Sequence, residues 1–313
     1  MESENQVTHK KGEPKQKYKF GFVALVGRPN TGKSTLVNTL LKQKISITAN
    51  KPQTTRTNIR GFLTRDDYQA VLVDTPGIHQ PANSLHKKIV SMAVKQIECS
   101  DLILFITEPY LPKGEISEED SQVIKYLKKT GTPVFMLINK MDIHSPEETF
   151  RFMDKIPKEF NFRESFSISA LKGKGTDIML DKLVKYLPEG NRLYPEDMVT
   201  DSTMREISGE IIRESVFRLI HKEIPYSTAV VIESFQEFPG LTRIFATIMV
   251  GKESQKVILI GKNGMMLKKI GTSARVKIQM MTLNTVFLDL KIKVAGNWFN
   301  NDKQLTEFGY DVS

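Results

Sequence analysis

The sequence predicts an α/β domain with a mostly parallel sheet and helices on both faces, followed by a smaller α+β domain. Through residue 188, short apolar runs alternate with segments of helical period, and the order of elements changes after residue 203. The apolar runs of the first part show no polar alternation, which is typical of strands buried between two layers of helices. A chain of 313 residues is long enough for two such domains.

The expected elements of the first domain follow one another in the order strand, helix, strand. The predicted strands are 20–27, 70–74, 101–107, 133–139 and 165–169. The predicted helices are 34–42, 84–98, 117–129, 146–159 and 177–187. We assign residues 18–188 to this domain and residues 1–17 to a flexible basic arm that precedes it.

A break in periodicity separates the two halves. Residues 188–202 hold two prolines, a glycine and four acidic residues, so we place the linker at 189–203. Residues 204–313 are assigned to the second domain and a tail. Its predicted elements are a helix at 205–223, strands at 227–238 and 243–250, two helices around a glycine turn at 261–264, and a strand at 284–296.

Charge and composition narrow the functional classes. The formal net charge is +9, and residues 252–293 alone hold nine basic against two acidic residues, which indicates an anionic partner. The single cysteine, Cys99, excludes an internal disulfide framework and a cysteine-cluster zinc site. No run approaches the roughly 20 apolar residues of a membrane span, and the first 20 residues do not resemble a secretory signal. We therefore expect a protein of the cytoplasm without a transmembrane segment.

The segment "GRPNTGKS" fits the phosphate-loop pattern G-x-x-x-x-G-K-[ST] between an expected strand and helix. Its backbone N–H groups and the helix N-terminus would surround phosphate oxygens. Lys33 would reach the β- and γ-phosphates, and Ser34 would bind Mg²⁺. The nucleotide-binding residues assigned here are Gly27, Asn30, Thr31, Gly32, Lys33, Ser34 and Thr35.

Two further motifs follow expected strands. Asp74 and Gly77 belong to "DTPG", in which the carboxylate would hold Mg²⁺ through water and the glycine N–H would contact the γ-phosphate. The same four letters also suit a simple turn at the end of a strand, but the position after the phosphate loop favours the functional interpretation.

The segments "NKMD" at 139–142 and "SAL" at 169–171 indicate that the base is guanine. The Asp142 carboxylate accepts hydrogen bonds, which suits the N1–H and 2-amino group of guanine and not adenine. Asn139 would bond the base edge and hold the phosphate loop, and the stem of Lys140 would lie over the ring. Backbone N–H groups of Ser169 and Ala170 would face guanine O6.

Together these motifs resemble the translation-factor-like GTPase superfamily. The resemblance implies a Mg²⁺-binding threonine in "QTTR" at 53–56, for which we choose Thr55 with Thr54 second. Lys33, Thr55 and Gly77 are then the catalytic residues. Ile78 stands where Ras-type enzymes have a water-orienting glutamine. In potassium-activated relatives an asparagine at the place of Asn30 binds a monovalent cation, so we expect K⁺ to act here.

The turn "GKNG" at 261–264 offers small residues beside which a nucleic-acid backbone can run closely. The order α-β-β-α-α-β around it resembles a type II KH domain, whose G-x-x-G loop clamps single-stranded RNA or DNA. The expected RNA-binding residues are Gly261, Lys262, Asn263, Gly264, Lys268, Lys269 and Lys277.

A P-loop GTPase domain followed by a type II KH domain resembles the Era family of bacterial ribosome-assembly GTPases. The match extends to "HKEIPYS" at 221–227, Trp298 and "FGY" at 308–310. The resemblance implies GTP and GDP as ligands with Mg²⁺, and binding to the 3′ end of small-subunit ribosomal RNA and to the small ribosomal subunit. It also implies a monomer with peripheral attachment to the inner face of the cell membrane. Thr31, Asn263 and the longer N-terminal arm depart from the family pattern.

Three other functions compete with a GTP-hydrolysing RNA switch. An RNA chaperone could use GTP only as a structural ligand, and it would show negligible hydrolysis with or without RNA. A small-molecule P-loop kinase fits poorly because "NKMD" selects guanine and the sequence offers no lid for an acceptor substrate. A GTPase acting only at the membrane would need an amphipathic anchor, which the sequence does not predict.

Overall fold

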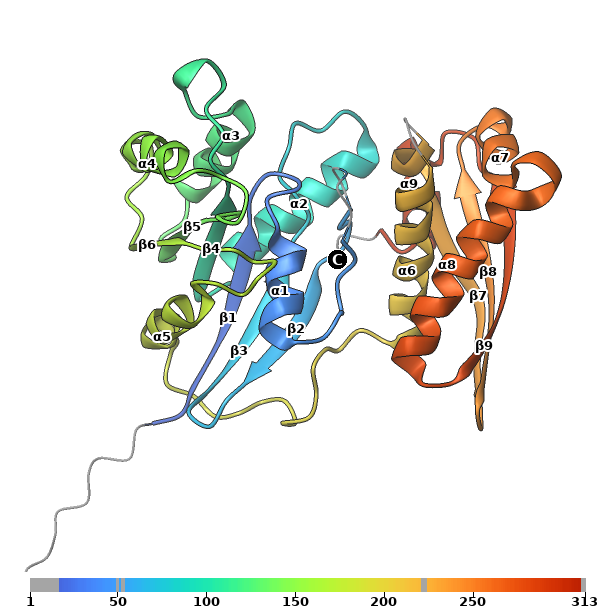
Figure 1. Ribbon diagram of the computed structural model, residues 1–313, viewed down its shortest axis with the longest axis horizontal. Coiled ribbons are helices and arrows are strands. Elements are labelled where there is room, and N and C mark those ends of the chain that lie inside the picture. Colours follow the sequence, from blue (N-terminus) through green and yellow to red (C-terminus); the bar gives the residue numbers. More distant parts are fainter. Residues whose placement is uncertain (1–16, 49–50, 52–53, 221–223, 311–313) are drawn as a thin grey trace, which may run out of the picture.

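The computed structural model describes residues 17–48, 51, 54–220 and 224–310, which form two domains (Figure 1). The expected N-terminal arm lies outside these residues except for Lys17, and so do Gln53 of "QTTR" and residues 221–223 of "HKEIPYS". Within the described parts, no helix is both long and apolar enough to cross a membrane.

The N-terminal domain contains a six-stranded sheet in the order β2-β3-β1-β4-β5-β6 within the described residues. Neighbouring strands are parallel except for β2 and β3, which are antiparallel. The strands are β1 (Lys19–Val26), β2 (Ile59–Thr64), β3 (Tyr68–Asp74), β4 (Leu102–Thr107), β5 (Val134–Ile138) and β6 (Glu164–Ser167). This arrangement confirms the predicted mostly parallel sheet.

Helices cover both faces of this sheet because its strands alternate their side chains between two cores. Val23 and Leu25 of β1 face the core of α1 and α5, whereas Ala24 and Val26 face the core of α2, α3 and α4. The helices are α1 (Lys33–Leu41), α2 (Ser84–Glu98), α3 (Glu118–Leu127), α4 (Pro146–Lys155) and α5 (Thr176–Tyr186).

Strand β2 was not predicted. It forms the edge of the sheet, and Gly61 and Thr64 interrupt its apolar pattern. The predicted linker lies along this edge: the Phe62 N–H donates to Val199 O at 2.8 Å. The ring of Tyr194 stacks on Phe62 with centroids 4.0 Å apart. The linker thereby satisfies backbone groups that an open edge strand would expose.

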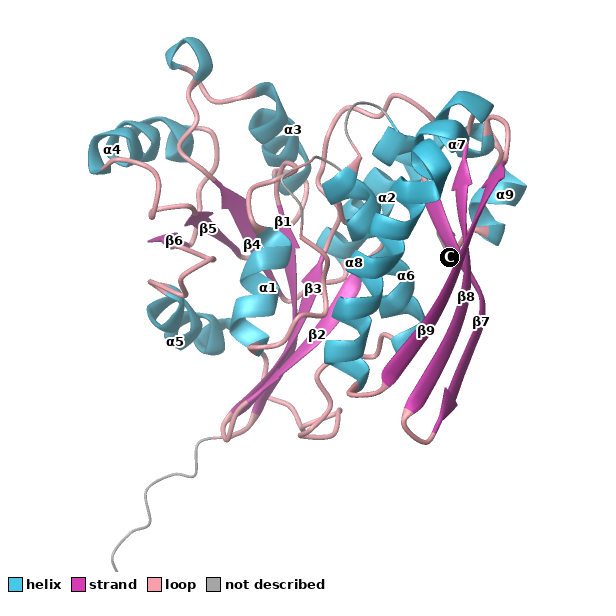
Figure 2. Cartoon of the chain, turned by 45° about the vertical axis from the view of Figure 1, so that its right-hand side comes forward, coloured by secondary structure: helices cyan, strands magenta, loops and turns pink. Residues whose placement is uncertain are grey.

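The C-terminal domain has the predicted order α-β-β-α-α-β, and α6 and α8 lie side by side on one face of its sheet (Figure 2). The sheet order is β7-β8-β9, with β7 antiparallel and β9 parallel to β8. This confirms the type II KH architecture. The elements are α6 (Met204–Leu219), β7 (Ala229–Phe238), β8 (Leu241–Val250), α7 (Glu253–Ile260), α8 (Met265–Thr282) and β9 (Thr285–Val294).

A tail that follows β9 joins the two domains. It includes the short helix α9 (Asp302–Glu307) and the buried ring of Trp298. Trp298 and Leu305 belong to one apolar cluster with Leu85 and Ile89 of α2, so the tail packs against the N-terminal domain. Helix α9 was not among the predicted elements.

Candidate functional site

The predicted nucleotide residues gather at the carboxyl ends of β1, β3 and β5, where ligands bind in open α/β sheets. A cavity of about 1080 Å³ lies there. Its lining includes the phosphate loop, Thr55 and Gly77, the "NKMD" segment and Ala170, together with Phe217 and Arg218 from the C-terminal domain. The structure therefore brings the separate motifs to one site, and the second domain forms part of its wall.

The phosphate loop is shaped by glycines and by a buried lysine. Gly27 cannot carry a side chain, since a Cβ atom there would lie 2.2 Å from Ile106 O. Lys33 Nζ donates to Gly27 O at 3.1 Å and to Arg28 O at 2.9 Å, so the ammonium group lies within the loop. Burial lowers the pKa of Lys33 to about 8. Phosphate oxygens would add negative charge beside this buried ammonium group.

The three predicted metal ligands lie together. Ser34 Oγ is 2.9 Å from Thr55 Oγ1, and Thr55 Oγ1 is 3.5 Å from Asp74 Oδ2. Asp74 is fully buried, its Oδ1 atom has no hydrogen-bond partner among the described residues, and burial raises the pKa of its carboxyl group. Two hydroxyls and an unsatisfied carboxylate are hard oxygen ligands, so this set fits Mg²⁺. Thr54, the second choice, instead donates to Lys51 O at 2.7 Å.

Gly77 packs directly on the phosphate loop. A Cβ atom at Gly77 would lie 2.7 Å from Pro29 N, so only glycine allows this approach. The backbone of this segment is held by Ile78 N, which donates to Gly27 O at 3.1 Å. Asn30, the predicted K⁺ ligand, is exposed at the rim of the loop with φ 64°.

The residues predicted to recognise guanine are held by hydrogen bonds between motifs. Asn139 Nδ2 donates to Thr31 O at 2.7 Å, and Asn139 Oδ1 accepts from the Ala170 N–H at 2.8 Å. The Ser169 hydroxyl donates to Asp142 Oδ1 at 2.6 Å and lowers the pKa of that carboxyl group. Asn139 thus ties the phosphate loop to the base-recognition loops.

A charged network that was not predicted from the sequence supports the same cavity. Arg28 Nη2 lies 3.0 Å from Glu108 Oε1, and Arg28 Nε donates to Asp120 Oδ2 at 3.2 Å. Glu108 also pairs with Lys140, and although its burial favours the neutral acid, Lys140 and Arg28 hold its pKa below the usual range. The Asp120 carboxylate also accepts a hydrogen bond from the Ser117 hydroxyl at 2.9 Å at the start of α3. Arg28 and Asp120 are 92 positions apart, so no local signal could identify this ion pair.

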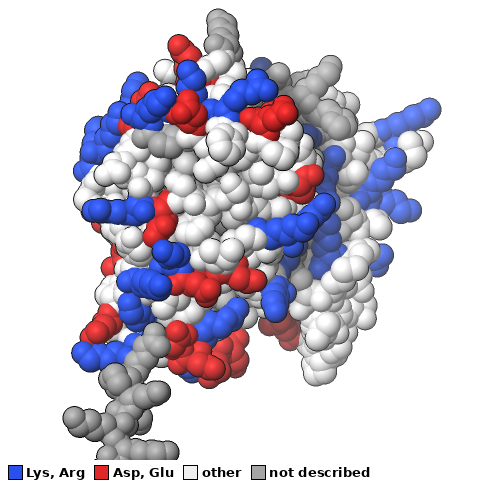
Figure 3. Space-filling view, turned by 60° about the vertical axis from the view of Figure 1, so that its left-hand side comes forward, with Lys and Arg blue, Asp and Glu red and all other residues white. Residues whose placement is uncertain are grey.

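The second glycine turn presents its predicted residues to solvent. Lys262, Asn263, Lys268 and Lys269 are exposed, and Gly261 and Gly264 have φ values of 70° and 74°. A groove of about 520 Å³ follows the turn between α8 and β9, lined by residues that include Gly264, Lys268, Arg275 and Phe287. Basic and acidic side chains are mixed over the N-terminal domain, whereas those visible on the flank of the C-terminal domain are mostly basic (Figure 3).

Lys277 is placed differently from the other predicted RNA-binding residues. Its Nζ lies 3.0 Å from a carboxylate oxygen of Glu214, and its side chain is only partly exposed. The ion pair holds Lys277 on the side of α8 that faces α6, where it neutralises a buried carboxylate.

Two protein families match separate parts of the chain. Residues 22–140 match the 50S ribosome-binding GTPase family, and residues 223–299 match the KH domain family. The fold and the site therefore define a P-loop GTPase with a C-terminal KH domain.

Full-length relatives identify the family. The chain is 44% identical over 297 residues to GTPase Era of Syntrophus aciditrophicus, which covers 94% of this chain and 96% of the relative. It is also 44% identical to GTPase Era of Ruminiclostridium cellulolyticum, over 95% of this chain and 99% of that protein. The chain belongs to the GTPase Era family and is a GTPase.

Two solved structures of the family extend over almost the whole chain. One is Era in complex with MgGDPNP and nucleotides 1506-1542 of 16S ribosomal RNA, which is 36% identical with a TM-score of 0.89. The other is a variant of Aquifex aeolicus Era bound to GDP.AlF4-, which is 37% identical with a TM-score of 0.88. Each covers 94% of this chain and is itself fully covered.

Proposed function

We propose that this GTPase binds the 3′ end of small-subunit ribosomal RNA and acts in assembly of the small ribosomal subunit. The observation that carries the proposal is that one chain holds two glycine turns beside cavities with basic lining residues, one at the carboxyl ends of the strands and one beside the groove between α8 and β9. The related Era whose structure contains MgGDPNP and a 16S ribosomal RNA fragment supports this assignment.

GTP and GDP would bind in the larger cavity. Lys33 would exchange its carbonyl partners for phosphate oxygens and stabilise the negative charge that develops during hydrolysis. The Gly77 N–H would donate to the γ-phosphate, and Asp142 would accept the hydrogen bonds of guanine. Mg²⁺ would be held by Ser34 and Thr55 with Asp74 behind it, and when bound it neutralises phosphate charge.

The attacking water requires another partner because Ile78 is fully buried and carries no polar group. K⁺ bound by the exposed Asn30 would supply positive charge beside the phosphates. Hydrolysis should then be faster in potassium than in sodium salts at matched ionic strength. Equal rates in the two salts would exclude this role for Asn30.

The RNA backbone would run along the turn at 261–264 and the groove between α8 and β9. Lys262, Lys268 and Lys269 are exposed and can pair with phosphates. Lys277 would first have to leave Glu214, so we assign it a smaller part in RNA binding.

We further propose that the protein is a cytoplasmic monomer and that a fraction of its molecules attaches to the inner face of the membrane. This part of the proposal is supported by the family resemblance. Sedimentation would test the monomer, and flotation with anionic vesicles would test the attachment.

The coupling of the two sites can be tested with one matched pair of variants. Gly264→Asp places a negative charge in the RNA turn, where an added Cβ meets no atom within 4 Å. Gly240→Asp is the control. Gly240 has nearly the same φ (73° against 74°), and a Cβ atom added there also meets no atom within 4 Å, but it lies in the β7–β8 turn and not in the turn at 261–264.

GTP hydrolysis is measured in potassium buffer with and without a short RNA that matches the 3′ end of small-subunit ribosomal RNA. RNA should stimulate the wild type and Gly240→Asp but not Gly264→Asp. Negligible hydrolysis by all three proteins, with RNA still bound, would favour the alternative of an RNA chaperone with GTP as a structural ligand.

A further inference from the structure

Arg56 reaches from the nucleotide site into the other domain. It follows Thr55 directly in the chain and is 1% exposed. Its Nη1 donates to Thr228 O at 2.7 Å and to the Tyr310 hydroxyl at 3.2 Å. Its Nη2 donates to Pro225 O at 3.1 Å and to Tyr226 O at 2.8 Å. All four acceptors belong to the C-terminal domain.

The surroundings of this guanidinium group suit a cation. Its Cζ lies 5.9 Å from the ring centroid of Phe217 and 5.8 Å from that of Tyr310. Burial of a charged group is unfavourable unless polar partners replace the lost water. Because the second domain provides the four acceptors, Arg56 can stay buried only while the two domains are in contact.

Residues close to Arg56 in the chain are held by helix α6 of the C-terminal domain. Arg213 of α6 donates to Thr54 O, and Lys51 Nζ donates to Phe217 O and Ile220 O at the C-terminal end of α6. A cation at that end of a helix also interacts favourably with the helix dipole. Thr55 thus lies between two residues that the C-terminal domain fixes in place.

We propose that Arg56 is a positioning residue for Thr55, and that the C-terminal domain completes the Mg²⁺ site through it. Docking of the domains fixes the backbone on both sides of Thr55 while its hydroxyl lies 2.9 Å from Ser34 Oγ. The entropy of ordering this loop is then lost when the domains dock and not when the nucleotide binds. The inference rests on the metal role of Thr55 in the proposed function.

The proposal predicts a difference between the two nucleotides. Contacts of the γ-phosphate and Mg²⁺ order this kind of loop, and they are released after hydrolysis. Loss of Arg56 should therefore weaken binding of a non-hydrolysable GTP analogue and leave GDP binding almost unchanged.

The test uses full-length Arg56→Met, Arg56→Lys and Tyr310→Phe, the last of which removes one acceptor and keeps the ring. Arg60→Met is the matched control, because Arg60 lies in the adjoining strand, is half exposed and pairs with Asp201 at the surface. Affinities for GDP and for the GTP analogue are measured by competition at several Mg²⁺ concentrations. Hydrogen exchange of residues 54–58 is followed without nucleotide.

We expect Arg56→Met to weaken analogue binding about tenfold, a typical size for coupling between two sites. It should also raise the Mg²⁺ concentration needed for half-maximal analogue binding and speed exchange at residues 54–58. Tyr310→Phe should show smaller changes of the same kind, and Arg60→Met none. This comparison remains informative if Arg56→Met folds poorly.

Equal losses for GDP and the analogue, or unchanged exchange at residues 54–58 in Arg56→Lys and Tyr310→Phe, would overturn the proposal. Failure of the wild type to bind GTP would instead refute the proposed function. The two failures are therefore distinguishable.

Discussion

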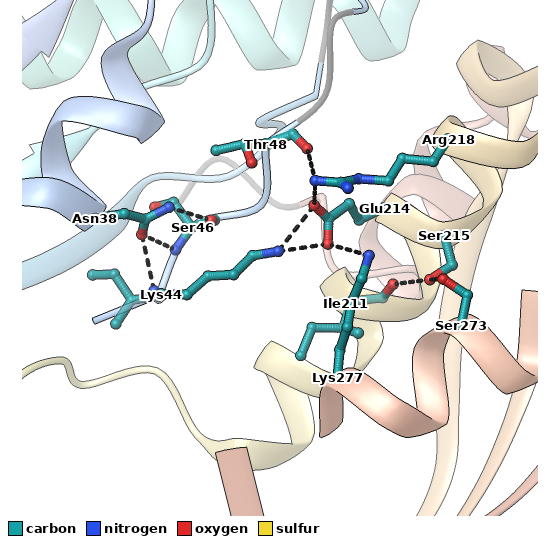
Figure 4. Close-up of polar contacts among 11 residues, drawn as sticks. Asn38, Lys44, Ser46, Thr48, Ile211, Glu214, Ser215, Arg218, Ser273 and Lys277 are labelled. Carbon is teal, nitrogen blue, oxygen red and sulfur yellow. Dashed lines mark hydrogen bonds and ion pairs between the residues drawn. The ribbon is translucent and has the colours of Figure 1, made fainter. Parts of the chain in front are cut away.

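The ion-pair cluster around Glu214 allows a quantitative test of the contact between the domains (Figure 4). The Glu214 carboxylate is fully buried and lies 2.8 Å from the Nζ of Lys44, which among the described residues is its ion-pair partner from the N-terminal domain. Its other partners, Arg218 at 2.8 Å and Lys277 at 3.0 Å, belong to the C-terminal domain. Lys44→Met therefore removes the ion pair that Glu214 makes across the interface and leaves its two ion pairs within the C-terminal domain.

The size of the effect follows from burial. Breaking a buried ion pair typically costs about 3–5 kcal/mol because one charge is left without a partner. Here Glu214 keeps two cations, and the Lys44 side chain is 38% exposed, so the loss is smaller. We expect a coupling energy of about 1–2 kcal/mol between Lys44 and Glu214, at the low end of values measured for close charge pairs at interfaces.

The single tryptophan provides the assay. Trp298 is buried in the tail cluster together with Leu85 and Ile89 of the N-terminal domain, so its fluorescence reports loss of the contact between the domains as well as unfolding of the tail. Urea unfolding is measured for the wild type, Lys44→Met, Glu214→Gln and the double variant, and the cycle yields the coupling energy. Lys42→Met is the control, because Lys42 is exposed two residues away.

A coupling energy below about 0.3 kcal/mol, within the usual error of additivity, would refute the reasoning. It would mean that Lys44 is solvated in solution and that Glu214 is neutralised by Arg218 and Lys277 within its own domain. An effect of Lys42→Met as large as that of Lys44→Met would point to general charge and not to this contact.

Three further predictions concern the N-terminal domain. Gly32→Ala places a Cβ atom 2.2 Å from Asn139 Nδ2 at φ +100°, so guanine-nucleotide affinity should fall on the order of 100-fold in binding titrations. Gly173→Ala, with positive φ and room for the Cβ atom, should bind normally. Burial, with His79 and Arg56 nearby, lowers the pKa of His86 to about 4. The unfolded chain takes up this proton near pH 6.5, so the free energy of unfolding should fall by about 1–3 kcal/mol between pH 6.5 and 4. Urea unfolding of His86→Asn should show a shallower fall, and an unchanged slope would exclude His86 as the source. Asp142→Asn should lose GTP binding and gain xanthosine triphosphate binding in competition assays, because an amide can donate to the xanthine carbonyl. Unchanged preference for guanine would contradict this role.

The sequence predicted those parts of the site whose chemistry is local. Lys33 and Ser34 lie in one short loop, and buried strands with a clear apolar pattern lead to Asp74 and Asn139. Strand β2 was missed because a glycine interrupts it and its pairing is with β3 and the linker.

Contacts between distant residues could not be predicted from local pattern. Arg28 and Asp120 are 92 positions apart, and Arg56 and Tyr310 are 254 apart. Lys277 illustrates the same limit, since a cluster of basic residues predicted RNA binding while its actual partner, Glu214, lies on another helix. A cluster of basic residues in a sequence predicts a nearby anion. It does not show whether that anion belongs to a ligand or to another part of the same protein.

The linker that lies along β2 determines how far the domains can separate. Thr200 is bonded to Arg60 O at 2.6 Å, Asp201 pairs with the Arg60 side chain at the surface, and α6 begins at Met204, so the tether between the domains is at most residues 201–203. Three extended residues span only about 10 Å. If the interface opens, the KH domain can rotate but cannot diffuse away, and its effective concentration at the nucleotide site stays in the millimolar range typical of short linkers. Re-docking then requires no search through solution, so even a weak interface can re-form after each opening.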